Sequence, residues 1–505
     1  MTENRSSEER LRVVLNDLCL TKKSDVYLMI VHADPSIPQA GGTERHVESL
    51  LDALQEAGHA VFVLFPSEQA TIGIRYAFQH QILFEDVLSD QIIFSLISEF
   101  EKSVDCLHIH HILGWREPII IRFSEGRFLK KIITLHDFYF ICPSIQMLKG
   151  PTGITFCGVE KDIKACNHCL RYFHGFRNYS IERYRQHSFI FLRRFDKIVL
   201  PSESIKIYFK EAFQKYWNEL EHKVAVVSHD LSALFKYADE QELQIKQANQ
   251  SLYVFVGALS FHKGFHLIAG LARRLRAEGK KMEIWGRALA WHPFMRGVVV
   301  RPYHSTEELK NLFVQYQPAY VILPFLWAET FSYVFYETMI LGKQAVSVVG
   351  KYGYPAEVIA QTHAGIVMDT MDADGLYQAC LAASQNYDAC ILHKQEWICA
   401  LKNNQHQYTE RYLKILYDLL DKNFYSLSIS HEEHVLLCGY SQKKKNMSSL
   451  SLLIDAWHLI FTRLRNPHAF IFFIGRGMQV FREEGLNGIK DRLHRFFFAR
   501  SPYDS

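Results

Sequence analysis

Apolar runs of strand length alternate with helix-patterned segments through the first half of the chain. After "DVYLMIVHA", which starts at Asp25, the apolar runs are "AVFVLF" at 60–65, "CLHIHH" at 106–111, "KIITLHD" at 131–137, "KIVLPS" at 197–202 and "KVAVVS" at 223–228. Buried strands that alternate with helices are typical of a parallel sheet covered by helices. The pattern therefore predicts an α/β fold.

A polar segment, "YADEQELQIKQANQS" at 237–251, separates this series from a second one that begins with "LYVFVGALS". The second series continues with "KMEIWG", "GVVVRPY", "AYVILP" and "QAVSVVG", and a long helix near 405–422 closes it. We predict two doubly wound, Rossmann-like domains at 25–236 and 252–422, after an N-terminal extension at 1–24. Open α/β sheets bind ligands at the carboxyl ends of their strands, so a ligand site is expected in a cleft between the domains.

The sequence of the last part of the chain resembles that at the start of the second domain. "VLLCGYSQKKKN" at 435–446 resembles "VFVGALSFHKG" at 254–264, and each copy is followed by a strand that ends in Gly-Arg, "IWGR" at 284–287 and "FIGR" at 473–476. Two landmarks in the same order predict a partial Rossmann-like repeat at 430–505, although any two strand–helix–strand units look partly alike. The repeat contains no acidic motif and is expected to be dispensable for ligand binding.

Composition places the chain among globular proteins. It has 505 residues, of which 48% are apolar and 22% charged, and a formal charge of +3. This small charge does not favour a nucleic-acid partner, whereas a local basic patch remains compatible with peripheral contact at the inner face of a membrane. The charged start "MTENRSSEERLRVV" is unlike a signal peptide, and no run reaches the ~18 apolar residues of a spanning helix. We therefore expect a cytoplasmic protein.

A glycine pair lies between the first strand and the first strongly patterned helix. In "ADPSIPQAGGTERHVESLL" at 33–51, Gly41 and Gly42 immediately precede residues with helical apolar spacing. Glycines let the backbone approach a ligand closely, and a helix N-terminus directs free N–H groups at an anion. The alternative is an ordinary tight turn between strand and helix.

Two glutamates flank the start of a predicted helix in the second domain. In "PFLWAETFSYVFYETMILGKQAVSV", Glu329 follows a strand that ends in a proline, and Glu337 lies within the helix. Carboxylates beside a helix N-terminus can accept hydrogen bonds from sugar hydroxyls while the helix end favours phosphate. The alternative is that Glu329 caps the helix and Glu337 is solvated.

Five segments in this order resemble the family 4 nucleotide-sugar glycosyltransferases, which have the two-domain GT-B fold. They are "GGTERHV", "HIHH", "TLHDFYFICPS", "GALSFHKGF" and "ETFSYVFYE", and the resemblance covers roughly residues 25–422. It implies an acceptor-side first domain and a second domain that binds the nucleotide-sugar donor. The subgroup it points to is bacterial and makes cell-surface polysaccharide such as lipopolysaccharide O-antigen or capsule.

The resemblance also implies roles for individual residues. It places Glu329 near the donor sugar, Glu337 on the ribose and Lys263 on the diphosphate, with His136 as the active-site histidine. We therefore expect His136, Glu329 and Lys263 to be catalytic. The expected donor-binding residues are Gly41, Gly42, Gly257, Lys263, Thr330, Phe331, Ser332 and Glu337.

The sequence departs from the family pattern at two places. Many relatives have an arginine where this chain has Ala258, so Lys263 would carry more of the phosphate charge, with Arg45 or Arg287 as substitutes. Ser228-His229-Asp230 replaces an expected Asn-Gly. His136 could also be a buried histidine that satisfies a loop carbonyl. His108, His110 and His111 alternate along a strand, and of these we retain His110 and His111 as candidates.

Four of the ten cysteines form a cluster. Cys142, Cys157, Cys166 and Cys169 have the spacing C-x14-C-x8-C-x2-C, and the last pair, "CNHC", has the short separation found in zinc sites. Four thiolates can hold a structural zinc, and free buried thiols or a redox pair are the alternatives. Disulfides are not expected in a cytoplasmic protein.

The function expected from these observations is retaining transfer of a sugar from a nucleotide-sugar donor to a glycan or lipid-linked glycan acceptor. The resemblance implies that catalysis requires no metal or other cofactor. A phosphorylase or sugar-phosphate synthase of the same fold is one alternative, although no pyridoxal phosphate lysine or second anion site can be assigned. A catalytically silent module that binds nucleotide sugar or scaffolds polysaccharide assembly is the other, and Ala258 and the partial repeat favour it.

Overall fold

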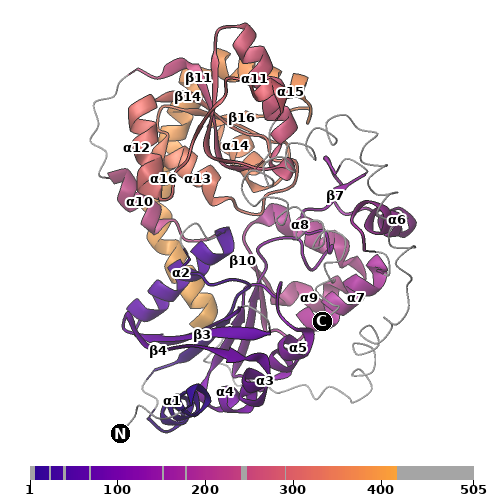
Figure 1. Ribbon diagram of the computed structural model, residues 1–505, viewed down its shortest axis with the longest axis vertical. Coiled ribbons are helices and arrows are strands. Elements are labelled where there is room, and N and C mark those ends of the chain that lie inside the picture. The colour runs from indigo at the N-terminus through magenta and orange to yellow at the C-terminus, as the bar shows by residue number, and fades with distance from the viewer. Residues whose placement is uncertain are drawn as a thin grey trace, which may run out of the picture.

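The computed structural model describes residues 6–21, 24–37, 41–67, 70–150, 153–176, 179–239, 247–289 and 292–417. These residues form two lobes, each built on one sheet (Figure 1). The predicted repeat at 430–505 lies outside the described residues. Within the described residues, no helix combines the length and the apolar character needed to cross a membrane.

The first sheet has the strand order β10-β9-β6-β5-β1-β2-β3-β4. Its strands are β1 Val26–Ile30, β2 Ala60–Pro66, β3 Thr71–Phe78, β4 Gln81–Ser89, β5 Cys106–Ile109, β6 Lys130–Thr134, β9 Lys197–Leu200 and β10 Val224–Val226. From β10 to β2, neighbouring strands pair in parallel. The parallel part is doubly wound, and its order reverses between β1 and β5, which is where such sheets bind ligands.

The antiparallel hairpin β3–β4 extends this sheet and was not predicted. Its two strands are joined by Gln79 and His80, which have φ of 50° and 59°. A two-residue turn with two positive φ angles suits a hairpin, but it normally contains glycine, asparagine or aspartate. The sequence therefore lacks the usual signal for this turn.

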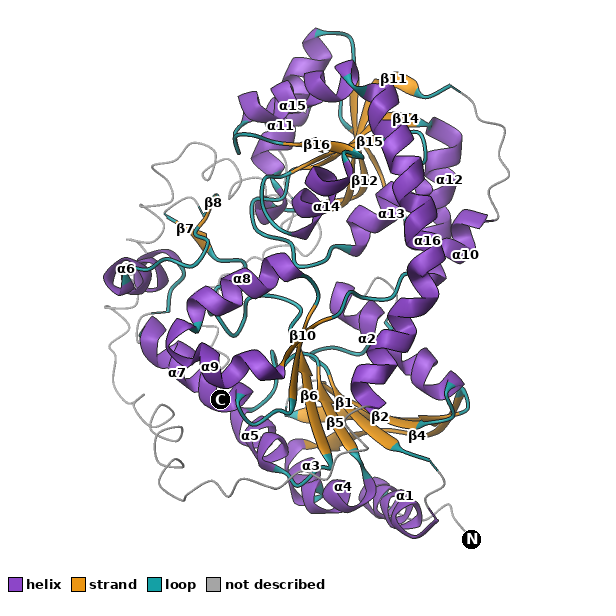
Figure 2. Cartoon of the chain, turned by 180° about the vertical axis from the view of Figure 1, so that it is seen from behind, coloured by secondary structure: helices purple, strands orange, loops and turns teal. Residues whose placement is uncertain are grey.

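Helices cover both faces of the first sheet (Figure 2). They are α1 Ser7–Thr21, α2 Gly42–Glu56, α3 Asp90–Ser95, α4 Ile97–Ser103, α5 Glu117–Glu125, α7 Ile181–Leu192, α8 Glu203–Ala212, α9 Trp217–Leu220 and α10 Ser232–Asp239, with the short 3₁₀ turns η1 Gln214–Tyr216 and η2 Glu221–Lys223. A small insertion beside the sheet contains β7 Leu148–Lys149, β8 Thr155–Phe156 and α6 Ile163–Phe173.

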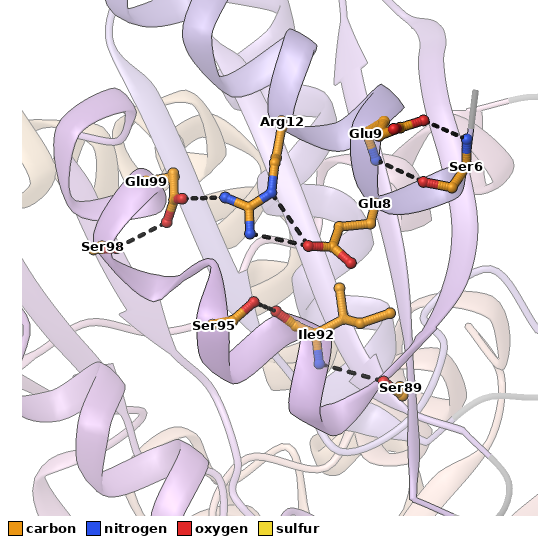
Figure 3. Close-up of polar contacts among 9 residues, drawn as sticks. All are labelled: Ser6, Glu8, Glu9, Arg12, Ser89, Ile92, Ser95, Ser98 and Glu99. Atoms are coloured by element: carbon orange, nitrogen blue, oxygen red, sulfur yellow. Dashed lines mark hydrogen bonds and ion pairs between the residues drawn. The ribbon is translucent and has the colours of Figure 1, made fainter.

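The segment before the first strand forms α1, which packs against α4 and β4. A capping box starts the helix: the Ser6 hydroxyl accepts from the Glu9 N–H at 3.3 Å, and the Glu9 carboxylate accepts from the Ser6 N–H at 2.9 Å. Arg12 then pairs with Glu8 in its own helix and with Glu99 of α4 (Figure 3). These contacts tie the start of the described chain to the first domain.

The second sheet is wholly parallel, with the order β13-β12-β11-β14-β15-β16. Its strands are β11 Asn249–Leu259, β12 Lys281–Ala288, β13 Val299–Arg301, β14 Pro318–Leu323, β15 Val346–Val349 and β16 Gly365–Val367, and its helices are η3 Phe261–Lys263, α11 Phe265–Ala277, η4 Pro293–Met295, α12 Thr306–Tyr316, α13 Tyr333–Leu341, α14 Tyr354–Thr362 and α15 Ala373–Gln385. This is the 3-2-1-4-5-6 order of a Rossmann fold. The predicted architecture of two Rossmann-like α/β domains is therefore confirmed.

The last described helix, α16 Tyr387–Tyr417, connects the two lobes. It packs on α13, α14 and α15 of the second domain and continues to α2 of the first domain. Figures 1 and 2 show it running from the upper lobe to the lower one. Its Leu413 packs against the cluster of buried apolar residues that includes Val47 and Leu50 of α2.

Candidate active site

The two domains meet through loops at the carboxyl ends of their strands. The first domain contributes the loops that follow β1, β6, β9 and β10, and the second contributes the loop from β14 to α13. Several residues singled out in the sequence lie in this interdomain site. It is the position that strand topology assigns to a ligand site in both sheets.

Glu337 lies inside this site and is not solvated. Its side chain is 3% exposed, and its carboxylate accepts from the Arg45 guanidinium of α2 at 2.8 Å and from the Thr306 hydroxyl at 3.3 Å. Arg45 also lies over the ring of Tyr333, 5.7 Å from its centroid. A buried carboxylate needs such partners to remain charged. The Arg45–Glu337 pair thereby joins α2 of the first domain to α13 of the second.

Glu329 does not cap α13. The cap is Ser332, which has φ 71° and whose hydroxyl accepts from the Phe335 N–H at 3.3 Å. Burial raises the pKa of Glu329, and the nearby ammonium of Lys263 opposes this effect. The backbone of Glu329 is bridged to Gly353, where an added Cβ would lie 2.5 Å from the Glu329 nitrogen. The loop therefore holds a partly buried carboxyl group at a fixed position.

Thr330 fixes the same loop against the first domain. Its hydroxyl donates to the backbone carbonyl of His136 at 2.5 Å, and its own carbonyl accepts from the Ser202 hydroxyl at 3.2 Å. Phe331 follows it and stacks on Tyr336, with ring centroids 4.7 Å apart. The predicted donor-binding run Thr330, Phe331 and Ser332 is thus part of the contact between the domains.

Lys263 ends the short helix η3, directly after β11. It is half-buried and forms no ion pair with any residue that the structure describes. Two glycines shape the backbone around it: Gly257 has φ 108°, and Gly264 has φ 81° with no room for a Cβ, which would lie 2.4 Å from the Pro324 carbonyl oxygen. These positions exclude larger residues. The Lys263 ammonium lies close enough to Glu329 to oppose the rise that burial causes in the pKa of its carboxyl group.

Gly41 and Gly42 lie at the start of α2, as predicted, with Gly41 as the N-cap. A Cβ on Gly42 would lie 3.4 Å from the Tyr333 ring of the second domain. The N-terminus of α2 therefore approaches the start of α13 closely. The positive ends of the α2 and α13 helix dipoles thus face the same interdomain region, which favours an anion there.

Four buried histidines, His46, His110, His136 and His229, lie close together beside the loop from β14 to α13. His46 of α2 stacks on His229 with ring centroids 3.9 Å apart, and Nδ1 of His110 lies 3.2 Å from Nε2 of His136. His229 in turn lies 4.7 Å from the Phe331 ring. Burial lowers the pKa of His46 to about 3, and burial and the neighbouring imidazoles lower the pKa of His110 and His136 well below its usual value. The cluster is therefore neutral at pH 7.

The sequence indicated only part of this cluster. His110 joins His136 as expected, whereas His111 pairs with Asp137 at 3.0 Å and lies outside the cluster. The parallel strands β5 and β6 are aligned with residues 24 positions apart side by side, and both pairs lie just beyond their carboxyl ends and join residues 26 positions apart. Helix α2 contributes His46 and the loop after β10 contributes His229, and neither was selected because an isolated histidine carries no pattern.

Ring nitrogens of His46, His110 and His136 lie within 4.8 Å of one another, and among the described residues no other set of histidine, cysteine or carboxylate ligands meets this distance. The four clustered cysteines lie elsewhere, in the insertion. There they line one cavity of about 410 Å³. Among the described residues, the histidine set alone has its ligand atoms close enough together to share a metal ion.

Ala258, which stands where many relatives have an arginine, has a cationic neighbour. Ala258 of β11 is paired in register with Arg287 of β12, whose exposed side chain forms no hydrogen bond or ion pair within the described ranges. Arg45, the other suggested substitute, is engaged with Glu337. Arg287 lies near the carboxyl end of β12, and Arg45 lies in the first turn of α2.

The chain is similar to glycosyltransferases in sequence and in fold. Residues 40–216 match the family model described as Glycosyltransferase Family 4. No curated protein sequence matches the chain. Three similar solved structures each have a TM-score of 0.51. A glycosyltransferase from Rickettsia africae is 13% identical, with 79% of this chain and 100% of that chain covered, and the sucrose-phosphate synthase of Thermosynechococcus elongatus is 14% identical, with 78% of this chain and 99% of that chain covered. HepE of Anabaena in complex with UDP and glucose is 12% identical, with 78% of this chain and 100% of that chain covered. At these identities the structures establish a shared fold.

Proposed function

We propose that this chain, whose residues 40–216 match the family 4 glycosyltransferase model and whose described part has the GT-B fold, transfers a sugar from a nucleotide-sugar donor with retention of anomeric configuration. The acceptor in this proposal is a glycan or a lipid-linked glycan of a bacterial surface polysaccharide. A lipid-linked acceptor would bring the protein to the inner face of the membrane. One observation carries the proposal: Arg45, near the N-terminus of α2, holds Glu337 of α13 across the two domains.

This arrangement suits a nucleoside diphosphate with a ribose at one end. Glu337 already accepts two hydrogen bonds from donors that ribose hydroxyls can replace. In our proposal the ribose takes the place of Arg45 on Glu337, and Arg45 turns to the diphosphate. Arg45 would then supply the charge that an arginine at Ala258 supplies in relatives. Lys263 and the N-termini of α2 and α13 complete the set of groups around the phosphates.

The chemical step needs these groups because negative charge grows on the leaving diphosphate. The bond between the anomeric carbon and the diphosphate oxygen breaks, the acceptor oxygen bonds to the same face of that carbon, and its proton passes to the departing phosphate oxygen. Fixed cations and N–H groups stabilise such developing charge strongly. Glu329 and His136 orient the sugar, and the neutral histidine cluster adds no positive charge beside the sugar ring. No step requires a metal ion.

The proposal is tested by thermal unfolding of the full chain against a panel of nucleotide sugars. The true donor, at a hundred times its dissociation constant, should raise the free energy of unfolding by ~2.7 kcal/mol. Glu337→Gln should reduce this shift, whereas Glu203→Gln, at the exposed start of α8, should keep it. If no nucleotide sugar stabilises the protein at millimolar concentration, the proposed donor site is wrong. A donor that binds without release of nucleoside diphosphate would favour the silent module.

A further inference from the structure

Helix α6 in the insertion buries very little apolar surface. Of its eleven residues only Leu170 is buried, and it packs in a small cluster with Ile181 and Tyr184. The neighbouring strands β7 and β8 have two residues each. Leu148 and Phe156 anchor this hairpin in the main core, whereas α6 has only its small cluster, and a segment with so small a core usually needs a staple such as a metal ion. Apolar packing therefore does not explain why α6 keeps its position.

The four cysteines come from three separate parts of the insertion and line one cavity. Cys166 and Cys169 lie one turn apart on α6, Cys157 follows β8, and Cys142 lies in the loop after β6. Residues three apart share a face of a helix, so the two thiols of α6 are directed to the same side. All four are free thiols.

A cation lies beside the four thiols. Arg185 of α7 lines the same cavity, and its guanidinium donates to the backbone carbonyl of Ile141, next to Cys142, at 3.3 Å. Its positive charge offsets part of the net negative charge that four thiolates around one Zn²⁺ would carry.

We propose that Cys142, Cys157, Cys166 and Cys169 bind one structural Zn²⁺ that fastens α6 to the β7–β8 hairpin. Four cysteine sulfurs form a closed, tetrahedral zinc site, in which no position is left for a substrate. The four sulfurs line the cavity wall and no three of them lie within 4.8 Å of one another, so a closed tetrahedral site requires the wall to move inward. The four thiols lose their protons as the zinc–sulfur bonds form.

The metal site would hold a contact between the two domains. Phe156, which ends β8 and precedes Cys157, lies against Tyr352 of the second domain with ring centroids 5.1 Å apart. Tyr352 belongs to the loop that contains Gly353, the glycine bridged to Glu329. The insertion is therefore a neighbour of the proposed donor site, while the zinc site itself does not depend on the proposed function.

Elemental analysis of the full chain, purified without chelator, tests the proposal. We expect about one zinc per chain, lost in Cys166→Ser and retained in Cys399→Ser, an exposed cysteine of α16 outside the cluster. Zinc removal from the wild type by a chelator should increase proteolytic cleavage within 142–180 by about tenfold while the core of the first domain stays folded. This second measurement applies even if Cys166→Ser does not fold. Metal below about a tenth per chain, or iron with acid-labile sulfide in place of zinc, would overturn the proposal.

Discussion

Single residues in the interdomain site differ in what they do during the reaction, and Lys263 is the clearest case. Its ammonium lies near Glu329 and forms no ion pair within the described residues. In the proposed reaction it faces a diphosphate whose negative charge increases in the transition state. Lys263→Ala should therefore lower kcat by about 10²–10³. Steady-state kinetics with Lys281→Ala, an exposed lysine at the start of β12, provide the control, and an unchanged kcat would remove Lys263 from the site.

Glu337 should behave differently because its proposed bonds to ribose are equal in the ground state and the transition state. Glu337→Gln keeps the shape of the side chain but weakens the hydrogen bonds that it accepts. KM for the donor should rise more than kcat falls. The variant also leaves Arg45 without its carboxylate, so its stability is measured in parallel. A selective loss of kcat would show that Glu337 acts on the sugar instead.

The buried histidines predict how stability depends on pH. His46, His108, His110, His136 and His229 have pKa values lowered by burial, those of His46 and His108 to about 3. In the unfolded chain they titrate near pH 6.5, so below this pH the unfolded state binds more protons. The free energy of unfolding should fall as pH drops below 6.5, by up to about 1.4 kcal/mol per pH unit for each histidine. Denaturant unfolding between pH 7.5 and 5 measures this slope.

Replacement of one histidine tests its origin. His46→Gln should make the slope shallower, whereas His222→Gln, at an exposed position in η2, should not. The same slope in the His46 variant and the wild type would mean that other groups cause the acid sensitivity.

At the scale of elements, α13 is held at both ends. Ser332 caps its start, and Lys394 of α16 donates to the Thr338 carbonyl in its last turn at 3.5 Å. Lys394 also donates to the carbonyls of Gly342 and Ala345, just beyond the helix, at 2.6 and 2.7 Å. Lys394 is fully buried, and burial lowers its pKa to about 7. A cation at a helix C-terminus is stabilising, but a buried charge is costly. The helix that carries Glu337 is thus anchored through a group that titrates near neutral pH.

This anchor predicts a second dependence of stability on pH. Between pH 7 and about 10 the unfolded chain keeps its proton on Lys394 while the folded chain has lost it, so the free energy of unfolding should rise with pH. Lys394→Met removes this contribution and should lower the slope between pH 7 and 9 by about 1.4 kcal/mol per pH unit. Chemical denaturation measures it, with Lys215→Met, at an exposed position in η1, as the surface control. Parallel slopes for Lys394→Met and wild type would show that Lys394 does not lose its proton in this range.

The elements also show which parts of the fold the sequence could predict. The long alternation of apolar strands and helices was sufficient for both parallel sheets, because fully buried strands produce continuous apolar runs. The β3–β4 hairpin was missed because Gln79 and His80 adopt the positive φ angles of its turn without glycine or asparagine. A local rule cannot find a turn whose residues are stabilised by the sheet around them.

At the scale of the whole molecule, the site is made by residues far apart in the sequence. Arg45 and Glu337 are separated by 292 positions, and Thr330 and His136 by 194. Motif resemblance named Glu337, Thr330 and His136 and put Arg45 forward for the phosphates, but not their pairing, because contacts between domains leave no periodic pattern. His46 and His229 were missed for the same reason. The strand ends could be predicted, and the contacts that join them required the structure.

The central claim is that the interdomain site transfers a sugar from a nucleotide sugar. The most direct test is the release of nucleoside diphosphate by the full chain, with the stabilising donor and a lipid-linked glycan acceptor fraction. The account predicts multiple turnovers by the wild type and a loss of at least about 10³ in kcat/KM when Lys263→Ala and Glu337→Gln are combined. Equal release by the wild type and the double variant would contradict it, because the reaction would then take place without the residues that define this site.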